Sequence, residues 1–260
     1  MPFLDTPAGR IAHDREGSGP PVVLVGGAFQ FRGFDPDTRE LAAELGRRGL
    51  TAVNYDRPGR GESTGAPPFT LAGEIAVLRA LAAELGPLAL YGSSSGAAIS
   101  LAAAAAGVPV TRLVLWEPPV GGDDASSAAA ELAGLRAELA TGDTERAVLF
   151  FMRDMPADWR EGARRGPAWP TMCALAPSLE PDLESIAWTQ SGPSRRELLA
   201  GVTAPTLVLV GERTLPMFPP AADSLTAALP DARQARVAAA EHRWELPAMA
   251  DALSAFLLPG

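Results

Sequence analysis

The residue of this chain with the clearest potential for chemistry is a serine between small residues. Residues 92–96 read Gly-Ser-Ser-Ser-Gly, a G-x-S-x-G pattern, which follows the apolar run Leu88–Tyr91 and precedes an alanine-rich stretch. This context predicts a strand, a sharp turn and a helix, in which a strained backbone lifts the central hydroxyl clear of the sheet. Small neighbours tolerate such a turn. We therefore predict that Ser94 is a nucleophile, the alternative being a plain turn that caps a helix.

A nucleophilic serine needs a general base, and the chain contains two histidines that can serve. His13 lies in the polar run His-Asp-Arg-Glu on an early predicted strand, and we expect it to be solvated. His242 follows the last predicted strand and precedes the last predicted helix. Position alone also allows His242 to be a histidine of a surface loop.

The charge of the chain limits its partners. The 260 residues carry a formal net charge of -9, which argues against nucleic acid and against anionic membrane surfaces. We expect a small-molecule substrate, no nucleic acid and no membrane, and the sequence leaves a homodimer open. All 22 basic residues are arginine, which excludes any mechanism that needs a Schiff-base or phosphate-loop lysine.

Cysteine usage and the first residues bear on the compartment. The single Cys173 cannot form an internal disulfide, and the absence of a cysteine cluster gives no sign of a metal site. The first residues contain an early aspartate and no apolar core, so no signal peptide is expected. The longest apolar tract, around residues 97–108, is too short to span a bilayer. We expect a cytoplasmic protein that uses neither a metal nor a cofactor.

The elements around these residues alternate between apolar strands and amphipathic helices. Such alternation predicts a parallel sheet with helices on both faces. Residues 118–201 contain helical pieces and no convincing strand, so we predict a helical cap over 120–199 inserted into a core of 1–119 and 200–260. Strands are predicted at Pro21–Val25, Leu50–Tyr55, Leu88–Tyr91, Val110–Trp116, Pro205–Val210 and Ala232–Val237, and helices at Pro36–Arg48, Leu71–Leu85, Ala221–Leu229 and Glu245–Leu257.

The order of these segments resembles that of the α/β-hydrolase superfamily, and the resemblance covers nearly the whole chain. It implies an α/β-hydrolase fold, which is a mostly parallel twisted sheet with helices on both faces and an inserted helical cap. It also implies a serine hydrolase of the esterase or lactonase type. The segments that carry it are VVLVGGAF at 22–29, YDRPGRGES at 55–63, YGSSSG at 91–96, LVLWEPP at 113–119, PTLVLVGER at 205–213 and the late His242.

The resemblance implies roles for single residues. In this superfamily the triad follows the chain order Ser, acid, His, so the base is His242 and not His13. The oxyanion hole would use the Ser95 N–H and a second N–H from the loop after the first buried strand. Aligned on the superfamily's loop, Ala28 supplies that second donor, or Phe29 does so if the loop is shifted by one residue.

The acid of the triad departs from the usual pattern. The superfamily usually places an aspartate after the strand Pro205–Val210, where this chain has Thr214, and a threonine carries no charge to stabilise an imidazolium. A known alternative position follows the strand after the elbow helix, which here ends at Glu117. A carboxylate between Trp116 and a proline would be partly buried and would need a partner. We predict Glu117 as the acid, although a cap-hinge ion pair with an arginine is an alternative role for it, and Glu212, Asp123 and Asp124 remain rival candidates for the acid.

The loop 56–61, Asp-Arg-Pro-Gly-Arg-Gly, offers two arginines that suggest an anion site. We prefer a structural loop whose arginines are solvated or paired internally, and we assign it no catalytic role.

Large apolar side chains are candidates for the substrate pocket. In a helical insertion such residues usually form its core, but above a nucleophile they would also form the wall of an apolar pocket. The predicted substrate-binding residues are Phe29, Trp116, Met152, Trp159 and Trp188.

Together these features predict a cofactor-independent serine hydrolase that cleaves a neutral, fairly apolar ester or lactone through an acyl-serine intermediate. The predicted triad is Ser94, His242 and Glu117. Two alternatives remain: a C–C bond hydrolase or hydroxynitrile-lyase reaction on the same triad, and a receptor-like binding protein with little turnover. Fluorophosphonate labelling separates an active nucleophile from an inert pocket.

Overall fold

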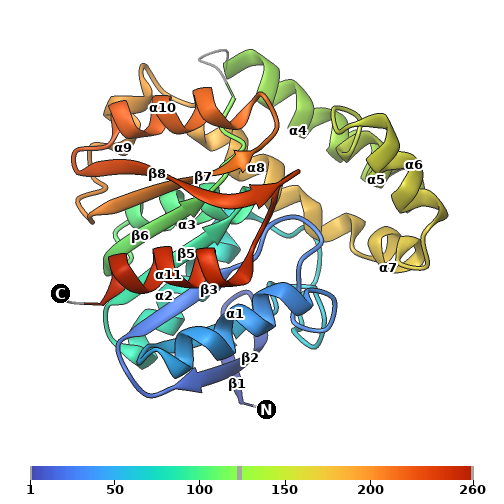
Figure 1. Ribbon diagram of the computed structural model, residues 1–260. Coiled ribbons are helices and arrows are strands. Elements are labelled where there is room, and N and C mark those ends of the chain that lie inside the picture. The colour runs from blue at the N-terminus through green and yellow to red at the C-terminus, as the bar shows by residue number, and fades with distance from the viewer. Residues whose placement is uncertain (1, 122–124, 259–260) are drawn as a thin grey trace.

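A nine-stranded sheet forms the centre of the computed structural model, which describes residues 2–121 and 125–258 (Figure 1). The strands from β4 to β8 in spatial order are parallel, whereas β1, β2 and β9 pair in the antiparallel sense. In spatial order the strands are β1 (Phe3–Thr6), β2 (Gly9–Gly17), β4 (Thr51–Tyr55), β3 (Pro21–Val25), β5 (Leu88–Ser93), β6 (Val110–Trp116), β7 (Thr206–Arg213), β8 (Ala232–Ala240) and β9 (Arg243–Trp244).

Helices cover both faces of this sheet, so the predicted fold class is confirmed. The central strands are apolar on both sides, and each face buries its own cluster of aliphatic side chains. One face is covered by α1 (Pro36–Arg47) and α11 (Leu246–Leu257), and the other by α2 (Leu71–Leu85), α3 (Ser95–Ala105) and α10 (Phe218–Ala228).

Two helices begin at the residues that their capping side chains predict. The carboxylate of Asp35 accepts a hydrogen bond from the Thr38 N–H, and a proline occupies the first turn of α1. The hydroxyl of Thr70 accepts a hydrogen bond from the Gly73 N–H at the start of α2. These caps fix the first residues of α1 and α2, which follow the loops after β3 and β4.

The segment between β6 and β7 contains helices joined by loops, and no strand occurs among its described residues. Figure 1 shows α4 to α7 projecting beyond the sheet edge, whereas α8 packs along α3 and α2. This segment therefore joins the core through α8 and α9, and the boundaries 120–199 of a separate cap stay a prediction. Its elements are α4 (Ala125–Ala140), α5 (Thr144–Phe151), α6 (Ala157–Arg165), α7 (Trp169–Ala174), the 3-10 helix η1 (Ala176–Leu179), α8 (Glu180–Thr189) and α9 (Arg195–Leu199). Within the described ranges, no helix has the length and apolar character needed to cross a membrane.

His13 is buried, and the expectation that it is solvated was wrong. Its strand β2 lies between β1 and β4 instead of at the sheet edge, and α1 packs against it, so only 1% of His13 is exposed. Burial lowers the pKa of the His13 imidazole, and the neighbouring Arg15 and Arg32 lower it further.

Candidate active site

Ser94 lies in a sharp turn between β5 and α3, which confirms the predicted strand–turn–helix. Its φ of 54° and ψ of -124° are strained for a residue with a side chain. The turn requires small neighbours. A Cβ on Gly92 would lie 2.5 Å from the Ala97 Cα, and one on Gly96 would lie 2.2 Å from the Val25 carbonyl oxygen. The glycines therefore allow β5, α3 and β3 to converge beneath Ser94.

The structure brings Glu117 and His242 into direct contact. The Oε2 atom of Glu117 contacts the Nδ1 atom of His242, and its Oε1 atom accepts hydrogen bonds from the Gly211 N–H at 2.9 Å and from the Thr214 hydroxyl. The Glu117 side chain is fully buried at the carboxyl end of β6. Thr214, at the position where the superfamily usually has its carboxylate, thus donates to the carboxylate that comes from β6.

Two aromatic rings hold the imidazole of His242, which follows β8. The ring of Phe218 on α10 stacks on it with centroids 4.6 Å apart and 8° between the planes. The Trp116 ring lies nearly parallel to it at 6.3 Å. Glu117 binds Nδ1, so a fixed imidazole leaves Nε2 available for another partner. The stacking of Phe218 was missed by sequence reasoning, because one aromatic residue at a helix start carries no distinguishing signal.

The rival acids do not compete for His242 in the part of the chain that the structure describes. Glu212 is exposed near the end of β7. Asp123 and Asp124 lie outside the described residues. Among the described carboxylates proposed from the sequence, Glu117 alone contacts His242.

Ala28 and Ser95 face the cavity that Ser94 and His242 also line. Among the hydrogen bonds between described residues, none is donated by the backbone N–H of Ala28 or of Ser95. Gly27 brings the two backbones together, because a Cβ there would lie 3.0 Å from the Ser94 Cβ. Two residues that line the cavity therefore have backbone N–H groups without an acceptor among the described residues.

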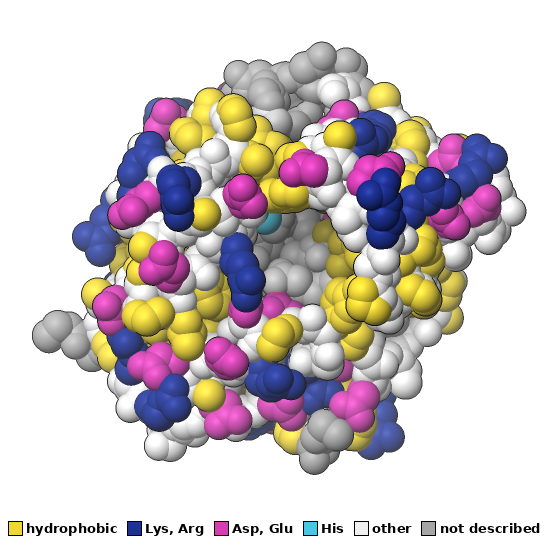
Figure 2. All heavy atoms as spheres, turned by 45° about the vertical axis from the view of Figure 1, so that its right-hand side comes forward, with side chains coloured by type: hydrophobic (Ala, Val, Ile, Leu, Met, Phe, Trp, Pro, Cys, Tyr) yellow, Lys and Arg dark blue, Asp and Glu magenta, His cyan; other side chains and the backbone are white. Residues whose placement is uncertain are grey.

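A cavity of about 520 Å³ contains Ser94 and His242. Figure 2 shows the hollowed face, with hydrophobic side chains along its rim and a cyan histidine inside. Its walls are mostly apolar, no arginine lines it among the described residues, and its carboxylates are Glu131 and Asp154. No group of three or more described His, Cys, Asp or Glu residues is arranged to hold a metal ion. The large apolar side chains of the lining are Phe151, Met155, Trp159, Leu183, Ile186, Leu215, Met217 and Phe218.

Of the substrate-binding residues expected from the sequence, Trp159 lines this cavity and the other four do not. Trp116 is buried in the sheet core beneath His242, and Met152 is buried inside the helical insertion. Trp188 packs against the cluster around α3, and the Phe29 ring packs edge-on against Phe151. Helical periodicity predicts that such side chains are buried, but it does not say which face of an insertion helix looks toward the nucleophile.

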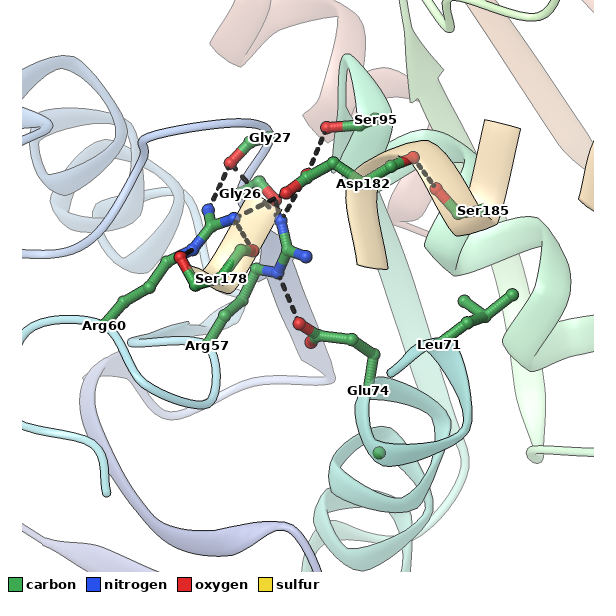
Figure 3. A network of polar contacts seen from close by, with 12 residues as sticks. Gly26, Gly27, Arg57, Arg60, Leu71, Glu74, Ser95, Ser178, Asp182 and Ser185 are labelled. Carbon is green, nitrogen blue, oxygen red and sulfur yellow. Dashed lines mark hydrogen bonds and ion pairs between the residues drawn. The ribbon is translucent and has the colours of Figure 1, made fainter. Parts of the chain in front are cut away.

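The arginines of the loop after β4 are paired internally, and the alternative of solvated arginines was wrong. Arg57 and Arg60 are each 1% exposed, and both contact Asp182 of α8 (Figure 3). Burial and the neighbouring Arg57 lower the pKa of the Arg60 guanidinium to about 10. Burial raises the pKa of the Glu74 carboxyl, although Arg57 and Arg60 oppose that shift. Sequence reasoning missed Asp182, because one acidic residue in an amphipathic helix is usually exposed.

Comparison with known proteins shows the family and agrees with the fold. The model of the alpha/beta hydrolase family matches residues 22–256, so the chain belongs to that family. An alpha/beta hydrolase from Sphaerobacter thermophilus is 34% identical, with a TM-score of 0.82 over 99% of this chain and 100% of the other. A hydrolase from Pseudomonas aeruginosa is 22% identical, with a TM-score of 0.73 over 99% and 98%. An enol-lactonase from Burkholderia xenovorans is 18% identical, with a TM-score of 0.65 over 98% of both chains. No curated protein matches this sequence.

Proposed function

We propose that this protein is a cofactor-independent serine hydrolase that cleaves a neutral, fairly apolar ester or lactone. The observation that carries the proposal is that the buried Glu117 contacts His242, which lines the same cavity as Ser94. In this proposal the three residues form a catalytic triad in which Ser94 is the nucleophile. The fold alone does not define the substrate.

The proposed reaction begins with attack of the Ser94 hydroxyl on the substrate carbonyl carbon. His242 Nε2 takes the hydroxyl proton and then gives it to the leaving alkoxide, while Glu117 orients the ring and stabilises the imidazolium. An acyl-serine ester remains. His242 next takes a proton from water, the resulting hydroxide attacks the acyl carbon, and Ser94 leaves with the proton.

The Ala28 and Ser95 amides are the proposed donors to the oxyanion. The support is that both residues line the cavity and that neither N–H is used elsewhere among the described residues. Phe29 is a weaker candidate, because it is not among the described cavity-lining residues. Two fixed N–H groups stabilise the charge that develops on the tetrahedral intermediate.

The lining of the cavity supports a neutral substrate. Among the described residues, eight large apolar side chains line the space, and the two carboxylates there would repel an anionic ligand. About 520 Å³ accommodates a small acyl and alcohol group. A lactone fits this description as well as an open-chain ester, and the enol-lactonase that shares the fold is a reason to include lactones in any test.

A fluorophosphonate probe tests the proposed nucleophile, and a panel of an ester, a lactone and a diketone tests the reaction. We expect covalent labelling of the wild-type protein that is lost in Ser94→Ala and kept in the matched control Ser93→Ala. We expect turnover of the ester or the lactone in the panel. Labelling that survives in Ser94→Ala would contradict the choice of serine, and turnover of the diketone alone would replace ester cleavage by C–C bond hydrolysis.

A further inference from the structure

A buried ionic network connects the helical insertion to the floor of the cavity (Figure 3). The carboxylate of Asp182 on α8 accepts hydrogen bonds from Arg57 Nη1 at 2.7 Å and from Arg60 Nη2 at 2.6 Å. Arg57 Nε also donates to Glu74 on α2 at 2.9 Å. All four residues are at most 1% exposed. Two guanidinium groups therefore face two carboxylates in a site with almost no exposure to solvent.

The network binds the peptide that carries one proposed oxyanion donor. Arg60 Nη1 donates to the Gly27 carbonyl oxygen at 2.6 Å, and Arg57 Nη1 donates to the Gly26 carbonyl oxygen at 3.2 Å. The Gly27 carbonyl and the Ala28 N–H belong to one planar peptide unit. In a trans peptide these groups point in opposite directions, so holding the carbonyl also fixes the direction of the N–H. A cationic donor on the carbonyl further polarises the same peptide unit.

The network also binds the residue that carries the other proposed donor. The Ser95 hydroxyl donates to Asp182 Oδ1 at 2.6 Å, and Figure 3 shows this contact. Ser95 is the first residue of α3, directly after Ser94. One carboxylate thus reaches the loop after β3 through the arginines and the start of α3 through a hydroxyl.

Such a network is costly to bury unless every charge is paired. Burial alone would raise the pKa of the Asp182 carboxyl, but Arg57 and Arg60 hold it below its usual range, so Asp182 is ionised at neutral pH. Apolar side chains would attach α8 to α3 at lower cost. Apolar contacts are not directional, so they would not orient two separate backbone amides, whereas hydrogen bonds do so.

We infer that Asp182, together with Arg57 and Arg60, forms a positioning network that aligns both amides of the oxyanion hole. This inference rests on the proposed function. It assigns the helical insertion a role in transition-state stabilisation beyond the formation of the cavity wall. None of the three side chains is among the described cavity-lining residues, so the network acts through Gly27 and Ser95 and not on the substrate.

The test compares an ester with its thiono analogue, in which sulfur replaces the carbonyl oxygen. Sulfur is a weak hydrogen-bond acceptor, so the thionoester gains little from an oxyanion hole. The probes are para-nitrophenyl butyrate and its thionoester. The variant Ser95→Ala removes the hydroxyl that Asp182 binds and keeps the Ser95 backbone amide. The matched control is Ser185→Ala. Ser185 is a buried serine on α8, and its hydroxyl donates to the Asp182 main-chain carbonyl at 2.8 Å and not to the Asp182 carboxylate.

Removal of an oxyanion donor lowers kcat by about 100-fold to 1000-fold, and misalignment costs less. We expect Ser95→Ala to lower kcat for the ester by about tenfold with KM within twofold, and to lower the thionoester rate by less than about threefold. The ratio of the two rates should be unchanged in Ser185→Ala. Loss of folded protein lowers both rates equally and leaves their ratio unchanged, so a purely structural role would not alter it.

The second variant is Asp182→Asn. If this variant folds, it should lower the ratio of the ester rate to the thionoester rate further than Ser95→Ala does. If it does not fold, the result for Ser95→Ala decides the question. A ratio in Ser95→Ala equal to that of the wild type and of Ser185→Ala would overturn the inference. A wild-type protein that neither cleaves an ester or a lactone nor reacts with fluorophosphonate would instead overturn the proposed function, and this inference with it.

Discussion

At the scale of single residues, strained backbone conformations occur at the edge of the sheet where the carboxyl ends of the parallel strands lie. Among the described residues, the non-glycine residues with positive φ are Phe29, Ser94, Glu117, Glu241 and His242. Each follows the carboxyl end of β3, β5, β6 or β8. A backbone in this region costs on the order of 1–3 kcal/mol per residue and persists where its surroundings hold it. Four separate strand ends carry this strain at the edge where Ser94 and His242 line the cavity, and this supports placing the proposed chemistry there.

The environment of the proposed acid could be predicted in part from the sequence. The pattern at the end of β6 predicted a partly buried carboxylate at Glu117, and the structure buries it fully beside His242. The role of Thr214 was not apparent, because a threonine there suggests only an absent acid. In the structure its hydroxyl donates to that carboxylate, so the residue remains part of the hydrogen-bond network.

Glu117→Gln tests the proposed acid. An amide cannot stabilise an imidazolium as a charge, so we expect kcat to fall by about 100-fold to 10000-fold while the fold is retained. Steady-state kinetics on the best substrate of the panel, with far-UV circular dichroism as the control for folding, measure the effect. A variant within about threefold of the wild type, a change of less than ~0.7 kcal/mol in the barrier, would exclude Glu117 as the acid.

Thr214→Val tests the hydrogen bond to the acid. Valine has the same shape and lacks the hydroxyl that donates to Glu117 Oε1. A hydrogen bond to a charged group contributes about 1.5–3 kcal/mol, and part of that loss should appear as a decrease of about threefold to thirtyfold in kcat. The decrease should vanish in the Glu117→Gln background, where the charged acceptor is absent. Equal decreases in both backgrounds would indicate that Thr214 acts independently of Glu117.

At the scale of elements, the strands of the core were well predicted and the surfaces of the inserted helices were not. Continuous apolar runs located β3 and β6 at their observed bounds, because a strand buried on both faces leaves that signature. The short β9 and the last residues of β7 lack it. In the insertion, a helical pattern identifies an apolar stripe but does not identify the partner that the stripe contacts. For this reason the sequence of α8 does not indicate that this helix packs on α3.

Trp159→Ala tests whether α6 contributes to the binding of substrate. Trp159 lines the cavity, so its removal should raise KM for a medium-length acyl ester by about tenfold, which corresponds to the loss of part of one aromatic contact. Labelling of Ser94 by a small fluorophosphonate should be unchanged. The matched control is Trp169→Ala, because Trp169 on α7 is also half-buried and is not among the described cavity-lining residues. A similar rise in KM in both variants would attribute the effect to loosening of the insertion.

At the scale of the whole molecule, two buried sites with ionisable side chains lie far apart in the sequence. One site is the network around Asp182, and the other is His13 on β2, which lies near Arg15, Arg32 and Asp14. The overall charge of -9 does not reveal these sites, because composition does not indicate which ionisable groups are buried. Both sites make the stability of the protein depend on pH, and only His13 titrates near neutrality.

His13 should make the protein less stable in weak acid. Its pKa is lowered in the folded protein by burial and by the charges of Arg15 and Arg32, while Asp14 opposes the shift. In the unfolded chain the imidazole titrates at its ordinary pKa of about 6.5. Between that value and the lower folded pKa, the unfolded chain binds the proton and the folded protein does not. The free energy of unfolding should therefore fall as the pH decreases below about 6.5, by at most ~1.4 kcal/mol per pH unit from this residue.

His13→Gln isolates this contribution, because glutamine is polar, of similar size and does not titrate. Urea unfolding followed by circular dichroism at pH 8, 7, 6 and 5 measures the free energy in both proteins, and we expect the two curves to run parallel between about pH 7 and 8. Below about pH 6.5 the wild type should lose stability faster than the variant, since all other titrating groups are shared. Two curves that stay parallel down to about pH 5 would mean that His13 takes up its proton equally well in the folded protein, and that its burial does not exclude the charge.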